Sequence, residues 1–380
     1  MSTVKMVKKD AGFSLVELLV SILISMIIFG GVVNVILNSN NTYRVEEEST
    51  YIQENIRYSV DVLTRDIQHA GFFECGTLSQ FRIANSIDNS AADSFLNLTA
   101  IEGYEGDLLA PVEYRADQYN DSDSILLRYA DTSTEVSVAS HSPNSAEIKL
   151  TGSHNFSVGT PLIVVDSNCG EMGFFSVSGP SDSSLPADHI VHNTGSGSNQ
   201  NCTKVIKASI SSFECDGSCT STSCGGNSPA EYSPGSSVFR FYSAAYYIGN
   251  SAIIPGMPAL KKATLLSSGV RLEELVQGVE RMEVLYGVDE DIRTHIDNPN
   301  WLSDMGDGII DSYQRADAVA DWNQVLAVKV NLFFRSQGDV FDADQVTTLH
   351  GIDFGPDRFL WRTASLTAQI RSRSRRDLMN

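Results

Sequence analysis

Three residues near the N-terminus, Gly12, Phe13 and Glu17, have types and a spacing that could support chemistry. They lie in the stretch KKDAGFSLVELLVS, residues 8–21, where a basic leader changes at the glycine into an apolar run. A carboxylate inside such a run costs about 2.5–3.5 kcal/mol on membrane-insertion scales. Glu17 is therefore a candidate functional residue, because a partner or a function must offset that cost.

The apolar run over residues 13–37 is long enough to cross a membrane as a helix. Its 25 residues span ~37 Å, and Glu17 is its only charge. The lysines that precede it predict a cytoplasmic N-terminus and an exported remainder. A cleaved secretory signal would be shorter and would end at a small-x-small site, which the residues after the run lack. A plain signal anchor is the other alternative, but it would need neither Gly12 nor Glu17.

Polar side chains form one stripe on this predicted helix. Ser14, Glu17, Ser21 and Ser25 fall within an arc of about 80°. Small and polar residues on one face mediate contacts between helices in membranes. The serines alone would be tolerated without a role, but with Glu17 on the same stripe a packing face is favoured.

The sequence from Gly12 to Val20, GFSLVELLV, resembles the type IV prepilin signature. The resemblance implies that a prepilin peptidase cuts between Gly12 and Phe13 and that the new Phe13 amine is N-methylated. It also implies that the apolar segment is kept as an anchor and later forms the core of a helical filament. Cleavage would create a cationic amine, and Glu17 could neutralise the amine of a neighbouring subunit. The hypothesis is that Glu17 sets the register between subunits.

Composition narrows the class of protein. The chain has 380 residues, 42% of them hydrophobic and 19% charged, which is typical of a globular protein. Lys and Arg number 27 against 47 Asp and Glu, a net charge of −20. This balance argues against nucleic acid as a partner and against electrostatic docking on anionic lipid. Attachment to a membrane must therefore be hydrophobic.

Residues 71–235 are rich in Ser, Asn, Gly and Asp, with short strand-like runs at 124–129, 147–150 and 161–165. Residues 176–237 are dominated by loops, which bury little apolar surface, so disulfides are a natural way to hold them. A zinc site is the alternative, but the exported setting and the absence of a nearby Cys/His partner favour disulfides. The candidate disulfide cysteines are Cys75, Cys169, Cys202, Cys215, Cys219 and Cys224.

The remainder predicts a helix followed by strands. Apolar residues recur at helical spacing over residues 43–68, and Gly71 is a plausible stop. Residues 238–248 are rich in strand-forming types, and apolar and polar residues alternate over 281–288, 325–335 and 360–370, which is typical of half-buried strands. The predicted fold class is α+β and pilin-like. A long N-terminal helix, membrane-embedded over its first half, packs on an antiparallel β-sheet, with a large loop-rich, disulfide-containing insertion.

Two blocks of sequence resemble the PilW family of minor pilins. One ends in TRDIQHAGFFEC at residue 75, and the other begins with GVERMEVLYGVD at residue 278 and continues through WNQV at residue 322. The resemblance covers residues 1–75 and 270–370 and implies a subunit of a minor-pilin complex that primes pilus assembly near the tip. The implied partners are prepilin peptidase, other minor pilins, the major pilin, a tip-associated adhesin and the inner membrane.

These features divide the chain into six predicted segments. They are a cleaved leader (1–12), a transmembrane and filament-core helix (13–37), its amphipathic continuation (38–70), a variable β and loop region (71–235), a C-terminal antiparallel sheet region (236–372) and a basic tail (373–380).

The aspartate-rich stretch over residues 289–311 is the strongest candidate for a metal-binding site in the sequence. Calcium prefers oxygen ligands, but the spacing differs from that of an EF-hand and the closing Glu is missing. A solvated acidic loop is favoured, calcium is the alternative, and no other cofactor is expected. His189 and His192 lack further spaced ligands, so we assign them no metal. The candidate calcium ligands are Asp289, Asp291, Asp304, Asp307 and Asp311.

The sequence contains no Gly-x-Ser-x-Gly elbow, Walker loop or His-Glu-x-x-His motif, so no catalytic residue is assigned and the chain is not expected to be an enzyme. The prediction is a minor pilin that crosses the inner membrane once, with a periplasmic C-terminal domain, and that reaches the cell surface in the pilus. A type II secretion pseudopilin is the first alternative. A membrane-tethered periplasmic enzyme or binding domain is the second.

Overall fold

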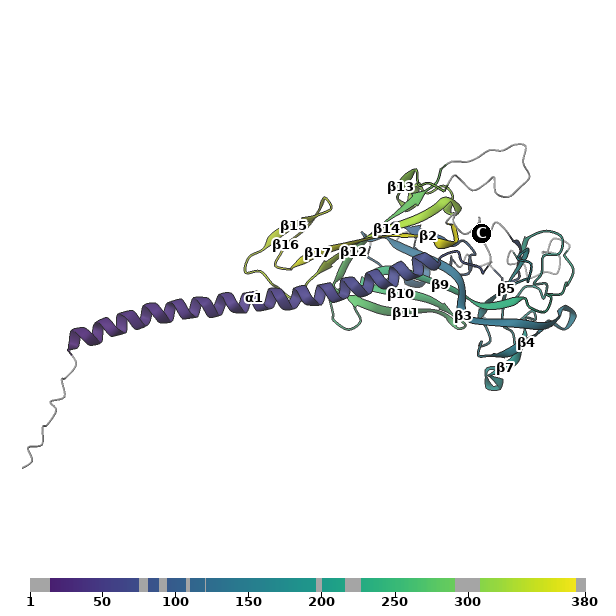
Figure 1. The fold of residues 1–380 in the computed structure, drawn as a ribbon, viewed down its shortest axis with the longest axis horizontal. Helices are drawn as coiled ribbons and strands as arrows, with labels where there is room; N and C mark the ends of the chain where they lie inside the picture. The colour runs from purple at the N-terminus through teal and green to yellow at the C-terminus, as the bar shows by residue number, and fades with distance from the viewer. Residues whose placement is uncertain are drawn as a thin grey trace, which may run out of the picture. The chain divides into compact units, whose positions relative to one another are not determined.

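The computed structural model describes residues 14–74, 81–88, 94–106, 110–119, 121–195, 200–215, 227–290 and 308–373 (Figure 1). Helix α1 (Leu15–His69) precedes the short helix α2 (Val112–Arg115) and all seventeen strands found in this part of the chain. Two compact units divide the chain. The hairpin unit comprises residues 1–51 and Ser336–Leu360, and the sheet unit comprises Ile52–Arg335 and Trp361–Asn380.

The hairpin unit contains the first part of α1 and the antiparallel pair β15 (Gln345–Leu349) and β16 (Ile352–Asp357). The turn between the two strands has positive φ at His350 (50°) and Gly351 (82°). Two consecutive positive φ values are what a tight hairpin turn requires, because they match the right-handed twist of the strands.

Polar contacts join α1 to the loop that leads into this hairpin. Asn41 Nδ2 donates to Asp342 Oδ2 at 3.4 Å, and the Gln337 N–H donates to Glu48 Oε2 at 3.0 Å. The Arg44 guanidinium also donates to a backbone carbonyl of this loop. Residues 41–48 of the helix are therefore engaged by their own chain.

The larger sheet of the sheet unit is mostly antiparallel. Its main path runs β7-β4-β3-β9-β5-β6-β1-β8, with β2 paired to β3, β10 to β9 and β11 to β10. Among the strands in the described part of the chain, only the pairs of β1 with β6 and with β8 are parallel. The strands are β1 (Arg82–Asn85), β2 (Ile101–Tyr104), β3 (Ser124–Ser142), β4 (Glu147–His154), β5 (Pro161–Val165), β6 (Glu171–Ser176), β7 (Ala187–Val191), β8 (Phe213–Glu214), β9 (Ser237–Asn250), β10 (Pro258–Leu266) and β11 (Gly269–Gln277).

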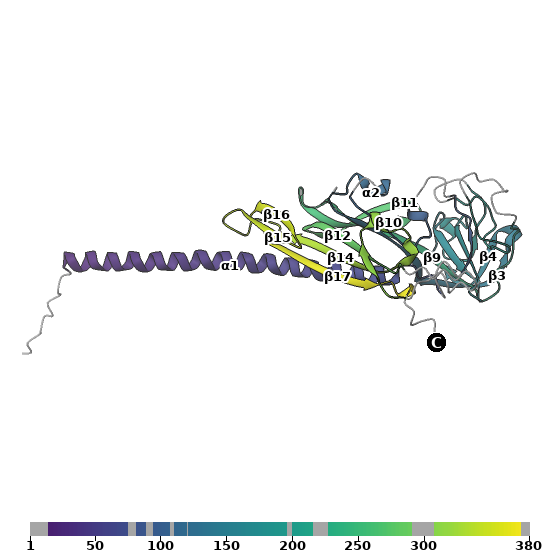
Figure 2. The same ribbon diagram turned by 90° about the horizontal axis from the view of Figure 1, so that it is seen from above.

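The second sheet is antiparallel throughout and has the order β13-β12-β14-β17. Figure 2 shows its three long strands side by side. The alternating pattern of the sequence predicted each of these long strands, and the prediction is confirmed. The strands are β12 (Val279–Val288), β13 (Ser312–Gln314), β14 (Val325–Arg335) and β17 (Trp361–Gln369).

The second part of α1 packs on the larger sheet. Ile52, Leu63 and Ile67 are at most 1% exposed. Asn55 Nδ2 donates to the Gln277 carbonyl of β11 at 3.2 Å. The helix stops where predicted, because Gly71 has a φ of +69°, which glycine adopts at little cost. The α+β class with a long N-terminal helix is confirmed.

The strand-like runs predicted in the middle of the chain lie in β3, β4 and β5, but this region is not a separate insertion. Strands β3 and β5 both pair with β9, so this region shares one sheet with the strand that opens the C-terminal part. A core of aromatic and aliphatic side chains lies within this unit. Fully buried aromatic members of that core include Phe73, Phe95, Phe174, Phe239, Phe241 and Tyr247.

Candidate functional site

The two predicted cleavage residues, Gly12 and Phe13, lie outside the described residues, which begin at Ser14. The cut between them and the methylation of the Phe13 amine therefore stay predictions. The described helix begins at Leu15, two residues beyond the predicted cut.

Glu17 lies in the first turn of α1. Its Oε2 accepts a hydrogen bond from the backbone N–H of Ser14 at 3.1 Å. This contact is one half of a capping box, S-x-x-E, in which a carboxylate three residues into the helix satisfies the amide of the capping residue. The carboxylate also lies at the positive end of the helix dipole. The S-x-x-E spacing is visible in the sequence and could have predicted this cap.

The position of Glu17 bears on the chemistry proposed for it. Ser14 directly follows Phe13, so the carboxylate is held at the helix end to which a new amine on Phe13 would be attached. A carboxylate at this end can accept hydrogen bonds from a cationic amine, either its own or that of a neighbouring helix.

The serines of the predicted stripe bond within their own helix. Ser21 Oγ donates to the Leu18 carbonyl at 2.9 Å, and Ser25 Oγ donates to the Ser21 carbonyl at 2.7 Å. Hydroxyls that bond back to the preceding turn need no partner from another helix. Within the stripe, Glu17 is then the residue with a charge to neutralise.

The apolar side chains over residues 15–37 are exposed on every face of α1. Leu15 is 74% exposed, Met26 69% and Phe29 70%. Within the described residues, α1 is the one helix long and apolar enough to cross a membrane, and its apolar window is not buried by the rest of the chain. A helix that is hydrophobic all round is stable only where lipid or other helices cover it.

The end of α1 is fixed to the sheet by what we call the Asp66 anchor, formed by Asp66, Tyr129, Tyr242, Tyr246 and Lys262. Asp66 is 2% exposed. Its Oδ2 accepts hydrogen bonds from the hydroxyls of Tyr246 at 2.5 Å and Tyr242 at 3.1 Å, and its Oδ1 accepts one from Tyr129 at 3.4 Å. Lys262 Nζ lies 3.4 Å from Oδ2 and contacts the faces of the Tyr242 and Tyr246 rings.

Burial, followed by the charge of Asp66, raises the pKa of Tyr242 and Tyr246 above the ordinary value, so both hydroxyls stay protonated and donate. The anchor sets how the helix is rotated on β3, β9 and β10. The sequence prediction missed Asp66, although its place between Leu63 and Ile67 on the apolar face was a signal.

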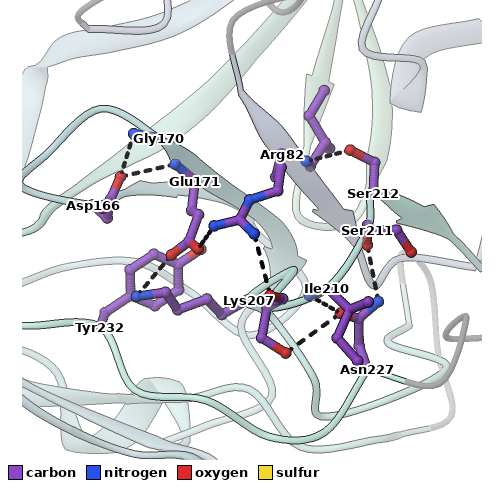
Figure 3. Close-up of polar contacts among 12 residues, drawn as sticks. Arg82, Asp166, Gly170, Glu171, Lys207, Ile210, Ser211, Ser212, Asn227 and Tyr232 are labelled. Carbon is purple, nitrogen blue, oxygen red and sulfur yellow. Dashed lines mark hydrogen bonds and ion pairs between the residues drawn. The ribbon is translucent and has the colours of Figure 1, made fainter.

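A second polar cluster holds the cysteine-rich segment to the sheet (Figure 3). We call it the Glu171 clamp. Glu171, at the start of β6, pairs with Arg82 of β1 and with Lys207 Nζ at 2.8 Å. Arg82 also donates to the Ser209 carbonyl at 3.2 Å, and Lys207 Nζ lies 5.0 Å from the centre of the Tyr232 ring. These contacts add to the apolar packing of the segment, in which Val205, Ala208 and Phe213 are buried.

The described cysteines lie near this clamp or near the strand it binds. Cys202 and Cys215 are 5% and 0% exposed, and their amides donate to the carbonyls of Ser86 and Asn85 at the end of β1. Cys169 is disulfide-bonded. Cys75, Cys219 and Cys224 lie outside the described residues, so the predicted disulfide framework stays a prediction.

Two of the candidate calcium ligands, Asp289 and Asp311, are described, and Asp291, Asp304 and Asp307 lie outside the described residues. Asp289 Oδ2 accepts the Gly308 N–H at 2.7 Å, and Asp311 Oδ2 accepts the Glu290 N–H at 2.7 Å. Each carboxylate thus accepts a backbone N–H from a residue about twenty positions away in the sequence. Among the described residues no group of three or more His, Cys, Asp or Glu side chains is placed to hold a metal ion.

The histidines near β7 do not form one site. The His189 side chain is 38% exposed and pairs with Asp188, whereas His192 is fully buried.

The structure combines an exposed apolar first part of α1, which begins with a capping glutamate, with a helix end anchored on a mostly antiparallel sheet, and these are features expected of a pilin-like protein. Comparison with known families agrees. Residues 245–372 match the model of the type IV pilus-assembly protein W family, and residues 7–33 match the prokaryotic N-terminal methylation motif.

Together these matches are those of a PilW-like type IV pilin, and the resemblance seen in the sequence is confirmed. No curated protein and no solved structure gives a significant match. The family match points to a structural or assembly protein rather than an enzyme. The methylation motif and the exposed apolar helix together support anchoring in a membrane.

Proposed function

We propose that this chain is a minor pilin of the type IV pilus, which primes assembly and is located at or near the pilus tip with other minor pilins. The observation that supports this most directly is the uncovered apolar surface of residues 15–37 with Glu17 at its N-terminal end. Such a surface suits a helix that moves from lipid into a bundle of similar helices.

The proposed sequence of events follows from these residues. Before assembly the chain crosses the inner membrane once, with its N-terminus cytoplasmic and its domain periplasmic. Prepilin peptidase removes residues 1–12, and the Phe13 amine is methylated. Glu17 then pairs with the amine of a neighbouring pilin, since two opposite charges in an apolar setting stabilise each other only as a pair. Further partners are the major pilin and a tip-associated adhesin.

Mass spectrometry of the membrane-extracted protein tests the processing step. We expect a mature N-terminus at methylated Phe13. An intact Met1, or a cut beyond residue 37, would contradict the pilin route.

Glu17→Gln tests the assembly step, with Ser21→Ala as the matched control on the same stripe. Both variants should be processed normally, because the cut lies before Phe13. Surface piliation should fall about tenfold or more for Glu17→Gln, since an unpaired amine in an apolar bundle is strongly unfavourable. It should be unchanged for Ser21→Ala. Normal piliation in Glu17→Gln would refute the charge-pairing role.

A type II secretion pseudopilin shares the N-terminal motif, but the match over residues 245–372 is to a pilus-assembly family and favours the pilus. Deleting the gene separates the two functions. We expect surface pili to be lost and protein secretion to continue, and the reverse result would assign the chain to secretion.

A further inference from the structure

Two buried histidines face each other in the sheet unit, and neither belongs to helix α1. His141 lies near the end of β3, and His192 directly follows β7. Their Nε2 atoms are 3.0 Å apart, and the residues are 5% and 0% exposed. A hydrogen bond of this length requires one of the two nitrogens to carry a proton and the other to be bare.

The neighbours of the pair determine which ring nitrogen carries each proton. The backbone N–H of Tyr232 donates to His141 Nδ1 at 3.1 Å, so this nitrogen is bare. A neutral His141 is then protonated on Nε2 and donates to His192 Nε2. His192 must consequently be protonated on Nδ1, a buried atom that has no hydrogen-bond partner in the described part of the chain. Both rings are neutral, and they are opposite tautomers.

We propose that the His141–His192 pair is an acid-sensitive latch, which holds the segment around Tyr232 on the sheet at neutral pH and releases it in acid. A further proton has two places to go. On His141 Nδ1 it removes the acceptor of the Tyr232 N–H, and on His192 Nε2 it removes the acceptor of His141. Either protonation therefore breaks a hydrogen bond of the latch.

Electrostatics keep the latch closed near neutral pH. Burial, with a smaller effect of Lys207, lowers the pKa of His141 from 6.5 to about 4. Burial, with smaller effects of His141 and Lys204, lowers the pKa of His192 to about 3. Since unfolded histidines titrate near 6.5, the stability that the neutral pair contributes is complete above that pH. It decreases as the pH falls from about 6.5 towards 3–4.

Charged groups on the elements packed around the pair do not offset this effect. In the described structure no carboxylate forms an ion pair with either ring, and Glu171 is already paired with Arg82 and Lys207. The titratable or charged groups on these elements are Glu147, Lys149 and His154 on β4, Glu171 on β6, Asp188 and His189 on β7, and Lys204, Lys207 and Glu231 in the segment that leads to Tyr232.

Tyr232 connects the latch to the Glu171 clamp. Its hydroxyl donates to the Ile206 carbonyl at 2.9 Å, and its ring lies under Lys207 (Figure 3). Loss of the Tyr232 amide bond therefore loosens a residue that also supports the segment containing Lys207. The expected result of acid is local release of this segment before the rest of the sheet unfolds.

Histidine-selective ¹⁵N NMR on the full chain in detergent tests the tautomers, because the chain has only 7 histidines. Single His→Gln variants assign the signals. At pH 5.5 we expect His141 to be neutral with its proton on Nε2 and His192 to be neutral with its proton on Nδ1. A charged ring at that pH, or the same tautomer in both, would overturn the proposal.

Hydrogen exchange of the peptide that contains Tyr232, corrected for the intrinsic rate, tests the release. In the natural chain and in the control His189→Gln, protection should fall about tenfold or more between pH 6.5 and 4. In the double variant His141→Gln/His192→Gln it should not change over this range. A constant protection in the natural chain, or a persisting fall in the double variant, would refute the latch. If the double variant fails to fold, the NMR titration of the natural chain decides.

Discussion

At the scale of single residues, Asp66 shows how a buried carboxylate can be stable when enough donors converge on it. Three tyrosine hydroxyls and Lys262 surround it, and its side chain is 3% exposed. Each donor comes from a strand that the helix crosses, so the hydrogen bonds act on the helix position directly. Apolar contacts alone would tolerate small rotations of the helix, whereas these bonds depend on angle as well as distance.

Replacing Asp66 with Asn should destabilise the chain clearly. Asn keeps one acceptor oxygen, but its other side-chain position is an NH₂ donor and it has no charge, so at least one tyrosine hydroxyl loses its acceptor and Lys262 loses its counter-charge. We expect the free energy of unfolding to fall by about 3 kcal/mol, measured by urea denaturation of the full chain in detergent. Asp61→Asn, on the exposed face of the same helix, is the control and should have an effect below about 0.5 kcal/mol. Equal effects of the two changes would contradict the anchor.

Asp123 is the opposite case, a buried carboxylate without enough donors. Burial raises its pKa from 3.8 to about 6, although the Val284 N–H donates to its Oδ2 at 2.8 Å. Because the folded-state pKa is the higher one, the folded chain holds this proton more tightly than the unfolded chain. The ionised form therefore costs stability above about pH 6, and this cost disappears as the pH falls towards 3.8.

Asp123→Asn should consequently stabilise the chain at neutral pH. Asn does not ionise and still offers an oxygen to the Val284 N–H. We expect a gain of about 2 kcal/mol in the free energy of unfolding at pH 7.5, which disappears by about pH 4. Urea denaturation at several pH values measures it, with exposed Asp317→Asn as the control. A gain that is independent of pH would show that ionisation is not its cause.

At the scale of elements, the parts predicted from the sequence are those with a local signal. Helix α1 and strands β12, β14 and β17 have clear periodicity, and all four were predicted. Strand β3 runs over 19 residues, but the sequence indicated only its first six. Its second half exposes polar residues and has no regular alternation, so its length follows from pairing with β9 and β4, which no local pattern shows.

The same reasoning separates the site residues that could be predicted from those that could not. Gly12, Phe13 and Glu17 form a linear motif and can be recognised in the sequence. The Asp66 anchor and the His141–His192 pair join residues that lie tens to hundreds of positions apart in the sequence, so they exist only after the strands have paired. Asp66 offered a weak local signal, and the histidines offered none.

The Glu171 clamp gives a prediction for the segment it holds. Glu171→Gln leaves Arg82 and Lys207 without their carboxylate, and removing one member of a buried ion pair costs more than the pair contributes. We expect limited proteolysis of the full chain to cut near Lys207 about five- to tenfold faster. Glu273→Gln, whose side chain is 51% exposed, should leave the cleavage rate unchanged. An unchanged rate in Glu171→Gln would show that the clamp does not hold the segment.

At the scale of the whole molecule, exposed apolar surface and negative charge lie in different parts of the chain. The first part of α1 is apolar and exposed, and all of the acidic excess behind the net charge of −20 lies after it. A filament built only from this chain would place that charge on every subunit, and the repulsion would oppose assembly. This supports the proposal of a subunit used in few copies beside partners of other composition.

Replacing the membrane-spanning segment tests whether the first part of α1 takes part in pilus assembly or only holds the domain at the membrane. A chain whose residues 1–37 are replaced by an unrelated single-pass anchor should stay in the membrane with an unchanged urea midpoint, because the Asp66 anchor and both sheets lie beyond the exchange. It should nevertheless fail to restore pili in a deletion strain, since the new helix lacks the cleavage site and Glu17. The matched control carries the corresponding segment of another prepilin and should restore them at least in part. Full restoration by the unrelated anchor would favour a tethered enzyme or binding domain, because for such a protein the helix would need only to hold the domain at the membrane.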